Sequence, residues 1–432
     1  MSTKYMVQDY IRYPRILRTL RRNIWLQTAE LERMQERKLE AILNHAYQNV
    51  PFYKGLFDSA GVKPGDIKTV NDLSKIPTVT KSEIRNAGRE ITAKNVDLNN
   101  CVEHRTSGST GTPLELLFTK EDTLYATATY DRARVENGLR LYRDSTLIVG
   151  FQYIPKGKTL YQRLGIRRRE GCNIFDSMDV QLSVLQRAKP DVILGYPSGI
   201  KLLAKAMQER DVKGIYPRFI STASEVLDPD TRKFVSSVFN AEIFDVYGAY
   251  ETGCMAWECS EQRGYHMSMD TVIMEFVDKN GERVAPGERG EVIVTNLHSY
   301  AMPIIRYRIG DYAIPTDEEC PCGRGGYLIK AIEGRCDDFI KLPGGQSISS
   351  LGLTTIMEFV AGVEEFQIVQ EKKDELTIYV VKKEGFEDSV ICNQIDDEFK
   401  KVLGKDINTK PEIVREIARE RSGKLRAVIS KL

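Results

Sequence analysis

The chain has 432 residues, of which 62 are basic and 61 acidic, so its formal net charge is +1. This length exceeds one ordinary domain, and the balanced charge gives no electrostatic argument for a nucleic-acid partner. The sequence contains no apolar run of the ~20 residues that a membrane-spanning helix needs. Its first residues lack the apolar core of a signal peptide, and eight cysteines without a short secreted framework indicate a reducing compartment. We therefore expect a cytoplasmic protein of two or three domains that binds no nucleic acid and has no integral membrane contact.

The N-terminal region has the pattern of one long helix from Pro14 to about His45, because apolar residues recur there near helical spacing. Pro14 suits the first turn of a helix. The early part of this helix is basic and contains Arg12, Arg15, Arg18, Arg21 and Arg22. Such helices usually pack on their own domain. Weak contact with an anionic membrane surface is an alternative interpretation of the same pattern.

A stretch rich in hydroxyl groups and glycine follows at Arg105–Leu114. Glycine lets the backbone approach a ligand closely, and hydroxyl and N–H groups gathered in one concavity bind anions. The stretch is not a Walker A loop, because no lysine follows the second glycine and Leu114–Phe118 has the pattern of a strand. A surface hairpin would use the same residue types. The candidate phosphate-binding residues are Thr106, Ser107, Gly108, Ser109, Thr110 and Gly111.

From about Leu116 to Ser224, short apolar strands alternate with helices, which implies a largely parallel sheet. The expected strands are Leu147–Phe151, Val192–Ser198 and Arg218–Thr222, and a helix is expected over Gly199–Arg210. Ligands of such sheets bind beyond the carboxyl ends of the strands. The pattern then changes to all-β over Met269–Ile314, with hairpin-forming strands at Val272–Asp278 and Gly290–Thr295.

After Gly334 the composition shifts to a smaller α+β unit. Its expected elements are strands at Phe366–Gln370 and Leu376–Val381 and a helix at Asp388–Leu403. The sequence therefore predicts an α/β protein with a large domain at 1–336 and a small domain at 337–432.

Four further motifs follow the hydroxyl-rich stretch, namely Tyr247–Thr252, Arg306–Asp311, Gly334–Lys341 and Arg421–Arg426. In this order and at these separations, the five motifs resemble those of the adenylate-forming superfamily of acyl-CoA synthetases, peptide-synthetase adenylation domains and luciferases. The phosphate loop without lysine, together with Asn49–Tyr53 and Asp72–Pro77, is similar to the phenylacetate–CoA ligase branch and its capsule-biosynthesis relatives. The resemblance covers most of the chain.

The resemblance implies a large domain of parallel-sheet layers with a small β-barrel portion, followed by a mobile C-terminal domain. It implies an AMP-forming carboxylate–CoA ligase that uses ATP and Mg²⁺ to convert a carboxylic acid to acyl-AMP with release of pyrophosphate, and then transfers the acyl group to coenzyme A. Transfer to an amine, a hydroxyl group or a carrier-protein thiol is an alternative. A non-catalytic nucleotide-binding scaffold is a second alternative, although the presence of Glu251, Asp311 and Lys424 argues against it.

The resemblance also assigns the nucleotide contacts. Glu251 is the expected Mg²⁺ ligand, since Mg²⁺ commonly takes one or two carboxylates plus substrate phosphates. A Glu that opens a helix could instead serve the helix dipole. Tyr247 and Gly248 match the segment that stacks on adenine, and Ser224 with Glu225 match a segment beside it.

Asp311 is expected to accept both ribose hydroxyls. One of Arg306 and Arg308 is expected to face the nucleotide and the other the barrel, and Arg308 is the expected nucleotide contact. Tyr250 occupies the position before Glu251 where the family has Thr, which removes the expected hydroxyl contact to phosphate.

Three more residues are expected to act in the two half-reactions. Lys424 matches the lysine that reaches the α-phosphate and the attacking carboxylate, Asp337 matches the hinge of the small domain, and Arg335 helps to anchor that hinge.

The acid-binding residues should come from the carboxyl ends of the central strands. The candidates are Phe151, Gln152, Tyr153, Tyr196, Ala223 and Ala249. This mixture suggests an aromatic or medium-sized acid, although core packing explains any one of these residues equally well. We also include a homodimer among the expected assemblies.

The cysteines indicate a separate site. Cys320 and Cys322 form a tight pair, and Cys259 and His266 lie upstream of it. A Cys₃His set is typical of structural Zn²⁺. The alternative is a group of reduced cysteines without metal.

Overall fold

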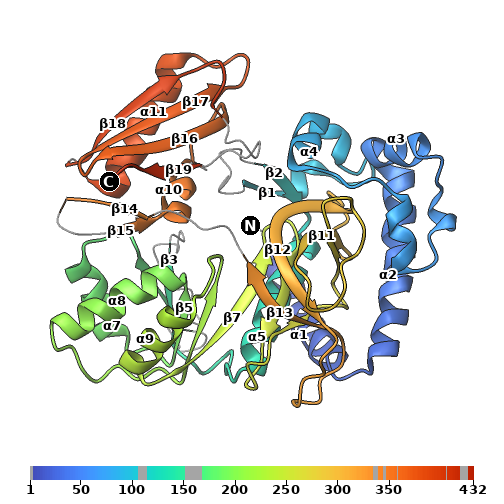
Figure 1. The fold of residues 1–432 in the computed structure, drawn as a ribbon, viewed down its shortest axis with the longest axis horizontal. Helices are drawn as coiled ribbons and strands as arrows, with labels where there is room; N and C mark the ends of the chain where they lie inside the picture. The colour runs from blue at the N-terminus through green and yellow to red at the C-terminus, as the bar shows by residue number, and fades with distance from the viewer. Residues whose placement is uncertain are drawn as a thin grey trace.

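The computed structural model describes residues 3–105, 114–150, 168–333, 339–343, 347–357, 359–404, 406–418 and 427–432. Figure 1 shows the N-terminal helices (blue) on one side of a large sheet and the parallel half of that sheet (green) on the other. The C-terminal strands, coloured orange to red, form a separate group above the parallel half.

The large sheet has 11 strands in the order β10-β11-β12-β13-β9-β8-β7-β6-β5-β3-β4. The half that runs from β7 to β4 is parallel, as the alternating pattern predicted. Its strands are β3 (Thr146–Gly150), β4 (Arg169–Asn173), β5 (Val192–Gly195), β6 (Phe219–Ala223) and β7 (Glu242–Ala249).

Helices cover both faces of this parallel half. One face carries α7 (Met178–Ala188), α8 (Pro197–Glu209) and α9 (Pro229–Phe239), and the other carries α1 (Thr3–Asn23) and α5 (Lys120–Glu136). Ile193 belongs to the first core, whereas its neighbours Val192 and Leu194 belong to the second, because successive strand residues point to opposite faces. The carboxyl ends of the strands therefore form the edge at which a ligand is expected.

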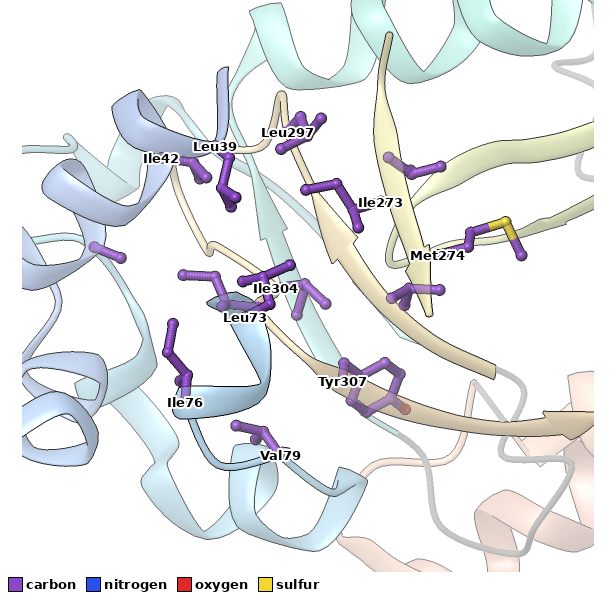
Figure 2. Packing of buried hydrophobic residues seen from close by; sticks show 14 of the residues in the cluster. Leu39, Ile42, Leu73, Ile76, Val79, Ile273, Met274, Leu297, Ile304 and Tyr307 are labelled. Carbon is purple, nitrogen blue, oxygen red and sulfur yellow. The ribbon is translucent and has the colours of Figure 1, made fainter. Parts of the chain in front are cut away.

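Antiparallel strands continue the same sheet where the barrel portion was expected. They are β8 (Gly253–Glu258), β9 (Tyr265–Met267), β10 (Val272–Val277), β11 (Gly290–Asn296), β12 (Tyr307–Thr316) and β13 (Leu328–Glu333). Figure 2 shows their core, in which Leu39 and Ile42 of α2 (Thr28–Asn49) share an interior with Ile273 of β10 and Tyr307 of β12. The N-terminal helices thus complete the core of this half.

The N-terminal region forms two helices, so the expectation of one long helix is wrong. α1 ends at Asn23, and the Ile24 carbonyl accepts a hydrogen bond of 3.1 Å from Gly325 N–H. Gln27 then caps α2, and its N–H donates to the Glu30 carboxylate at 3.0 Å. Apolar spacing continues across this break, so periodicity alone could not reveal it. Pro14 lies inside α1 and not in its first turn.

The apolar face of α1 is buried within the protein. Tyr13, Leu17 and Leu20 pack in a core with residues of α5 and the sheet, while Arg15 and Arg18 are exposed. This packing favours the interpretation of a helix that belongs to its own domain. Among the described residues, no helix combines the length and the apolar character that crossing a membrane requires.

The hydroxyl-rich stretch connects the two strands of an antiparallel hairpin, β1 (Val102–Arg105) and β2 (Glu115–Phe118). The strand expected after the stretch is therefore confirmed. The remaining helices of this part are α3 (Pro51–Ser59), α4 (Lys81–Ala87), η1 (Pro64–Asp66), η2 (Val70–Lys75), η3 (Gly88–Ile91) and η4 (Leu98–Asn100).

The C-terminal unit has its own sheet and core. The four-stranded sheet has the order β18-β17-β16-β19, and the helix expected at Asp388–Leu403 is present as α11. The other elements are β14 (Phe339–Lys341), β15 (Ser347–Ser349), α10 (Ser350–Met357), β16 (Val363–Lys372), β17 (Glu375–Lys382), β18 (Asn408–Ile413) and β19 (Val428–Ser430). Ile391, Ile395 and Phe399 of α11 lie one turn apart and are buried in this core. The position of the domain boundary stays a prediction.

Candidate functional site

The phosphate-loop candidates, 106–111, lie outside the described residues, but both ends of their hairpin are described. His104 of β1 stacks on Tyr250, with ring centroids 6.1 Å apart and an interplanar angle of 24°. Tyr250 precedes Glu251 in the turn between β7 and β8. The stem of the predicted phosphate loop therefore lies beside the turn that carries the predicted Mg²⁺ ligand.

Glu251 is held in a preformed turn. Its side chain is 7% exposed, and the Tyr307 hydroxyl lies 3.5 Å from Oε1. Asn296 Nδ2 donates to the Glu251 carbonyl at 3.0 Å. Beneath the turn, Thr129 of α5 accepts a hydrogen bond of 3.0 Å from the N–H of Cys254. The alternative in which Glu251 opens a helix is wrong, because the segment is a tight connection between antiparallel strands.

The predicted adenine and ribose residues meet. Tyr247 on β7 donates its hydroxyl to Asp311 Oδ2 on β12 at 2.9 Å, and both side chains are half-buried. These residues are 64 positions apart in the chain and come from different strands. The hydrogen bond holds the Asp311 carboxylate in one orientation.

Both arginines near Asp311 form ion pairs with glutamates. Arg306 is buried and binds Glu275 through two hydrogen bonds of 3.0 and 3.1 Å. It therefore faces the core of the antiparallel strands, as expected for one of the pair. Arg308 binds Glu291 of β11, with Nε 3.2 Å from Oε1. A nucleotide contact by Arg308 would have to compete with this ion pair, and it stays a prediction.

Ser224 and Glu225 follow β6 at the carboxyl edge. Ser224 has a positive φ of 74°, which is uncommon for a residue with a side chain. Glu225 accepts hydrogen bonds from the N–H and the hydroxyl of Ser198, both at 2.9 Å. Because Ser198 lies in the first turn of α8, the carboxylate also interacts favourably with the helix dipole. Ser198 was missed in the sequence, although its position between Pro197 and Gly199 at a helix start was a usable signal.

Three acid-site candidates lie at this same edge. Tyr196 follows β5, Ala223 ends β6 and Ala249 ends β7. Tyr196 covers Gly150 so closely that a Cβ atom at Gly150 would lie 3.4 Å from its ring. The other candidates, Phe151, Gln152 and Tyr153, lie outside the described residues. The same holds for Arg335, Asp337 and Lys424.

The four metal-ligand candidates converge. The donor atoms of Cys259, His266, Cys320 and Cys322 all lie within 4.8 Å of one another. Cys259 Sγ is 3.6 Å from Cys320 Sγ, and Cys322 Sγ is 3.3 Å from His266 Nε2. Burial, with a smaller effect of Arg324, lowers the pKa of His266 to about 4, so its imidazole is neutral as a metal ligand must be. A compact Cys₃His set can hold tetrahedral Zn²⁺.

Comparison with known proteins identifies the family to which the chain belongs. The AMP-binding enzyme family matches residues 32–299, and the CapK C-terminal domain family matches residues 341–431. The first match alone spans more than half of the chain. The chain belongs to the AMP-binding enzyme family. This membership confirms the resemblance to adenylate-forming enzymes that the motifs indicated.

Individual relatives of the AMP-binding family support the expected branch. The chain is 28% identical over 394 residues to a phenylacetate-coenzyme A ligase of Thermus thermophilus, covering 86% of each protein. It is 23% identical to the protein CapK of Staphylococcus aureus, covering 93% of this chain and 90% of CapK. A crystal structure of 2-hydroxyisobutyryl-CoA ligase with 2-HIB-AMP and CoA in the thioesterification state has a TM-score of 0.66 at 22% identity, covering 95% and 91% of the two chains. The last likeness confirms the α/β fold.

Proposed function

We propose that this chain is an AMP-forming carboxylate–CoA ligase. It activates a carboxylic acid with ATP to give acyl-AMP and pyrophosphate, and coenzyme A then takes the acyl group. The observation that carries the proposal is the hydrogen bond between Tyr247 and Asp311 next to the turn of Glu251 and the stem of the phosphate loop. The family match and a phenylacetate-coenzyme A ligase similar over 86% of this chain support the same reaction.

The division of labour follows from what phosphoryl and adenylyl transfer need, which is mainly positioning and charge stabilisation. The loop at 106–111 binds phosphates, Glu251 holds Mg²⁺, and Asp311 binds the ribose beside Tyr247. Lys424 stabilises the transition state of adenylation, and the small domain turns about Asp337, anchored by Arg335, before the thiol attacks.

The substrate is a small acid bound at the carboxyl edge near Tyr196, Ala223 and Ala249. A phenylacetate-coenzyme A ligase among the relatives favours an aromatic acid. Transfer of the acyl group to an amine, a hydroxyl group or a carrier-protein thiol is the second candidate.

We further propose that Cys259, His266, Cys320 and Cys322 bind a structural Zn²⁺. Their compactness and the neutral His266 support this assignment. We retain a cytoplasmic location and a homodimer as proposals. Contact with an anionic membrane surface would rest on exposed arginines such as Arg15 and Arg18, since the apolar face of α1 is used in packing.

The test is exchange of labelled pyrophosphate into ATP with a panel of aromatic, medium-chain and hydroxy acids. We expect one acid class to support exchange and CoA to yield the thioester. Lys424→Ala should lose adenylation by ~10²–10³-fold, yet convert supplied acyl-adenylate and CoA at close to the normal rate. If none of the acids supports exchange, the proposed function is refuted. A product that forms with amines but not with CoA would favour the second candidate.

A further inference from the structure

The hairpin of β1 and β2 makes an aromatic contact that the assigned roles do not use. His104 lies between two rings. It meets Phe118 edge-on at 5.7 Å and 68°, and it stacks on Tyr250 at 6.1 Å and 24°. Phe118 is part of the core, so His104 is held from the inside while Tyr250 approaches it from the neighbouring turn.

Each partner of the stack adjoins one element of the proposed site. His104 lies two residues before Thr106, where the phosphate loop begins, and Tyr250 directly precedes Glu251. The stack joins the stem of the hairpin to this turn through side chains. We propose that His104 and Tyr250 are positioning residues that hold the hairpin stem against the turn of the Mg²⁺ ligand Glu251.

The exposure of Tyr250 distinguishes a positioning role of its ring from a role in packing the core. Its side chain is 55% exposed, so removing the ring costs little buried apolar surface. The turn itself is held by other groups, since Asn296 binds the Glu251 carbonyl and Thr129 binds the N–H of Cys254. Loss of the Tyr250 ring should therefore release the hairpin stem at His104 from the turn without unfolding either segment.

The functional consequence falls on the nucleotide. MgATP must contact the loop through its phosphates and Glu251 through its metal, so both contacts depend on their separation. A displacement of about 1 Å at such a site can cost up to ~10²-fold in rate. The acid binds at the edge near Ala223 and Ala249 and should be much less affected. This inference rests on the proposed function, because it takes Glu251 and the loop as the MgATP site.

The test compares Tyr250→Ala, His104→Ala and the double variant, by direct MgATP binding and by KM for MgATP in the exchange reaction. Each single change should weaken MgATP about tenfold with KM for the acid within twofold. Aromatic pairs couple through contact, so the double variant should resemble the singles instead of multiplying their effects. Tyr250→Phe and His104→Phe keep a ring and should restore binding, and Tyr216→Ala, at an exposed tyrosine elsewhere, is the matched control.

Several results would overturn the proposal. They are multiplicative effects in the double variant, failure of Tyr250→Phe to restore MgATP binding, or an equal rise in the KM of the acid. If the alanine variants fold poorly, Tyr250→Phe and His104→Phe still test the proposal. Because both keep a ring, they must bind MgATP as tightly as the wild type. If no acid supports pyrophosphate exchange by the wild-type protein, the proposed function is refuted instead. Direct measurement of MgATP binding by the variants still tests the role of the stack.

Discussion

At the scale of single residues, the hydrogen bond between Tyr247 and Asp311 has the most direct chemical meaning. A carboxylate that accepts a hydrogen bond from a neutral donor is held in one orientation. If Asp311 binds the ribose as proposed, this preorganisation reduces the entropy lost when the nucleotide binds.

Asp311→Ala should weaken ATP binding by about 1.5–3 kcal/mol, the usual contribution of a hydrogen bond to a charged group. Tyr247→Phe should have a smaller effect, because it removes the orienting hydroxyl but leaves the carboxylate. Isothermal titration with ATP measures both, and Asp317→Ala, at an exposed aspartate that follows the end of β12, is the control. Unchanged affinity in folded Asp311→Ala protein would refute the ribose assignment.

Asp245 is a buried carboxyl group on β7 whose ionisation opposes folding. Burial, with a smaller contribution from Glu258, raises its pKa to about 6, although Thr222 and Tyr265 donate hydrogen bonds to it. Because the pKa of Asp245 is raised in the folded state, its contribution to the free energy of unfolding is present at low pH. This contribution is lost as the pH rises from about 4 to about 6. The cost at neutral pH is about 3 kcal/mol.

Asp245→Asn should remove this pH dependence. Relative to the wild type, the free energy of unfolding of the variant should increase by up to about 3 kcal/mol between pH 4 and pH 7, as measured by urea denaturation. If the asparagine makes poorer hydrogen bonds with Thr222 and Tyr265, the free energy of unfolding changes by an amount that does not depend on pH. A difference that does not change with pH would show that burial does not shift the pKa of Asp245.

At the scale of elements, the Cys/His cluster lies where neighbouring strands of the large sheet meet a loop. It connects the end of β8, the strand β9 and the loop between β12 and β13. The same loop touches the break between α1 and α2, where Arg324 lies over the Trp25 ring at 4.7 Å and Gly325 binds the Ile24 carbonyl. A metal here would fix the antiparallel half against the N-terminal helices.

Purified protein should contain about one zinc per chain by elemental analysis. Cys322→Ser should lose the metal and lower the melting temperature, because binding free energy of a structural metal is folding free energy. Cys392→Ser, outside the cluster, is the control and should change neither quantity. Metal-free wild-type protein with the same melting temperature would exclude the zinc proposal.

At the scale of the whole molecule, the described contacts of the C-terminal unit with the rest of the chain include two ion pairs and one apolar contact. Lys383 Nζ lies 2.9 Å from Glu115 Oε1 at the base of the phosphate-loop hairpin. Arg85 of α4 lies 4.0 Å from Glu364, and Phe175 packs against the C-terminal core. Exposed ion pairs contribute only about 0–1 kcal/mol each, so these two pairs add little to the docking. Such weak pairs would suit the domain movement that we propose between the two half-reactions.

Lys383→Glu should loosen the docked arrangement and change the ratio of adenylation rate to thioester-forming rate by roughly two- to fivefold, as expected for the loss of one exposed pair. The exchanged pair, Lys383→Glu with Glu115→Lys, should restore the ratio. Lys373→Glu makes the same charge change on an exposed lysine and should leave the ratio unaltered. If the exchanged pair behaves like the single variant, the contact does not govern docking.

The sequence by itself determined the local elements and the order of the motifs. The parallel strands β3, β5 and β6, the hairpin strands β10 and β11, and α11 follow from periodicity and turn residues, which are local properties of the chain. The break between α1 and α2 does not, since it depends on Gly325 from a distant loop.

Only the tertiary structure decided which motifs touch. It joined Tyr247 to Asp311, Cys259 to Cys320, Glu225 to Ser198 and His104 to Tyr250, across separations that no local pattern encodes. It also paired Arg308 with Glu291, although the sequence suggested a nucleotide contact. The physical reason is that side-chain partners are set by strand order and register, and these are selected by burial of the whole sheet rather than by neighbours in the chain.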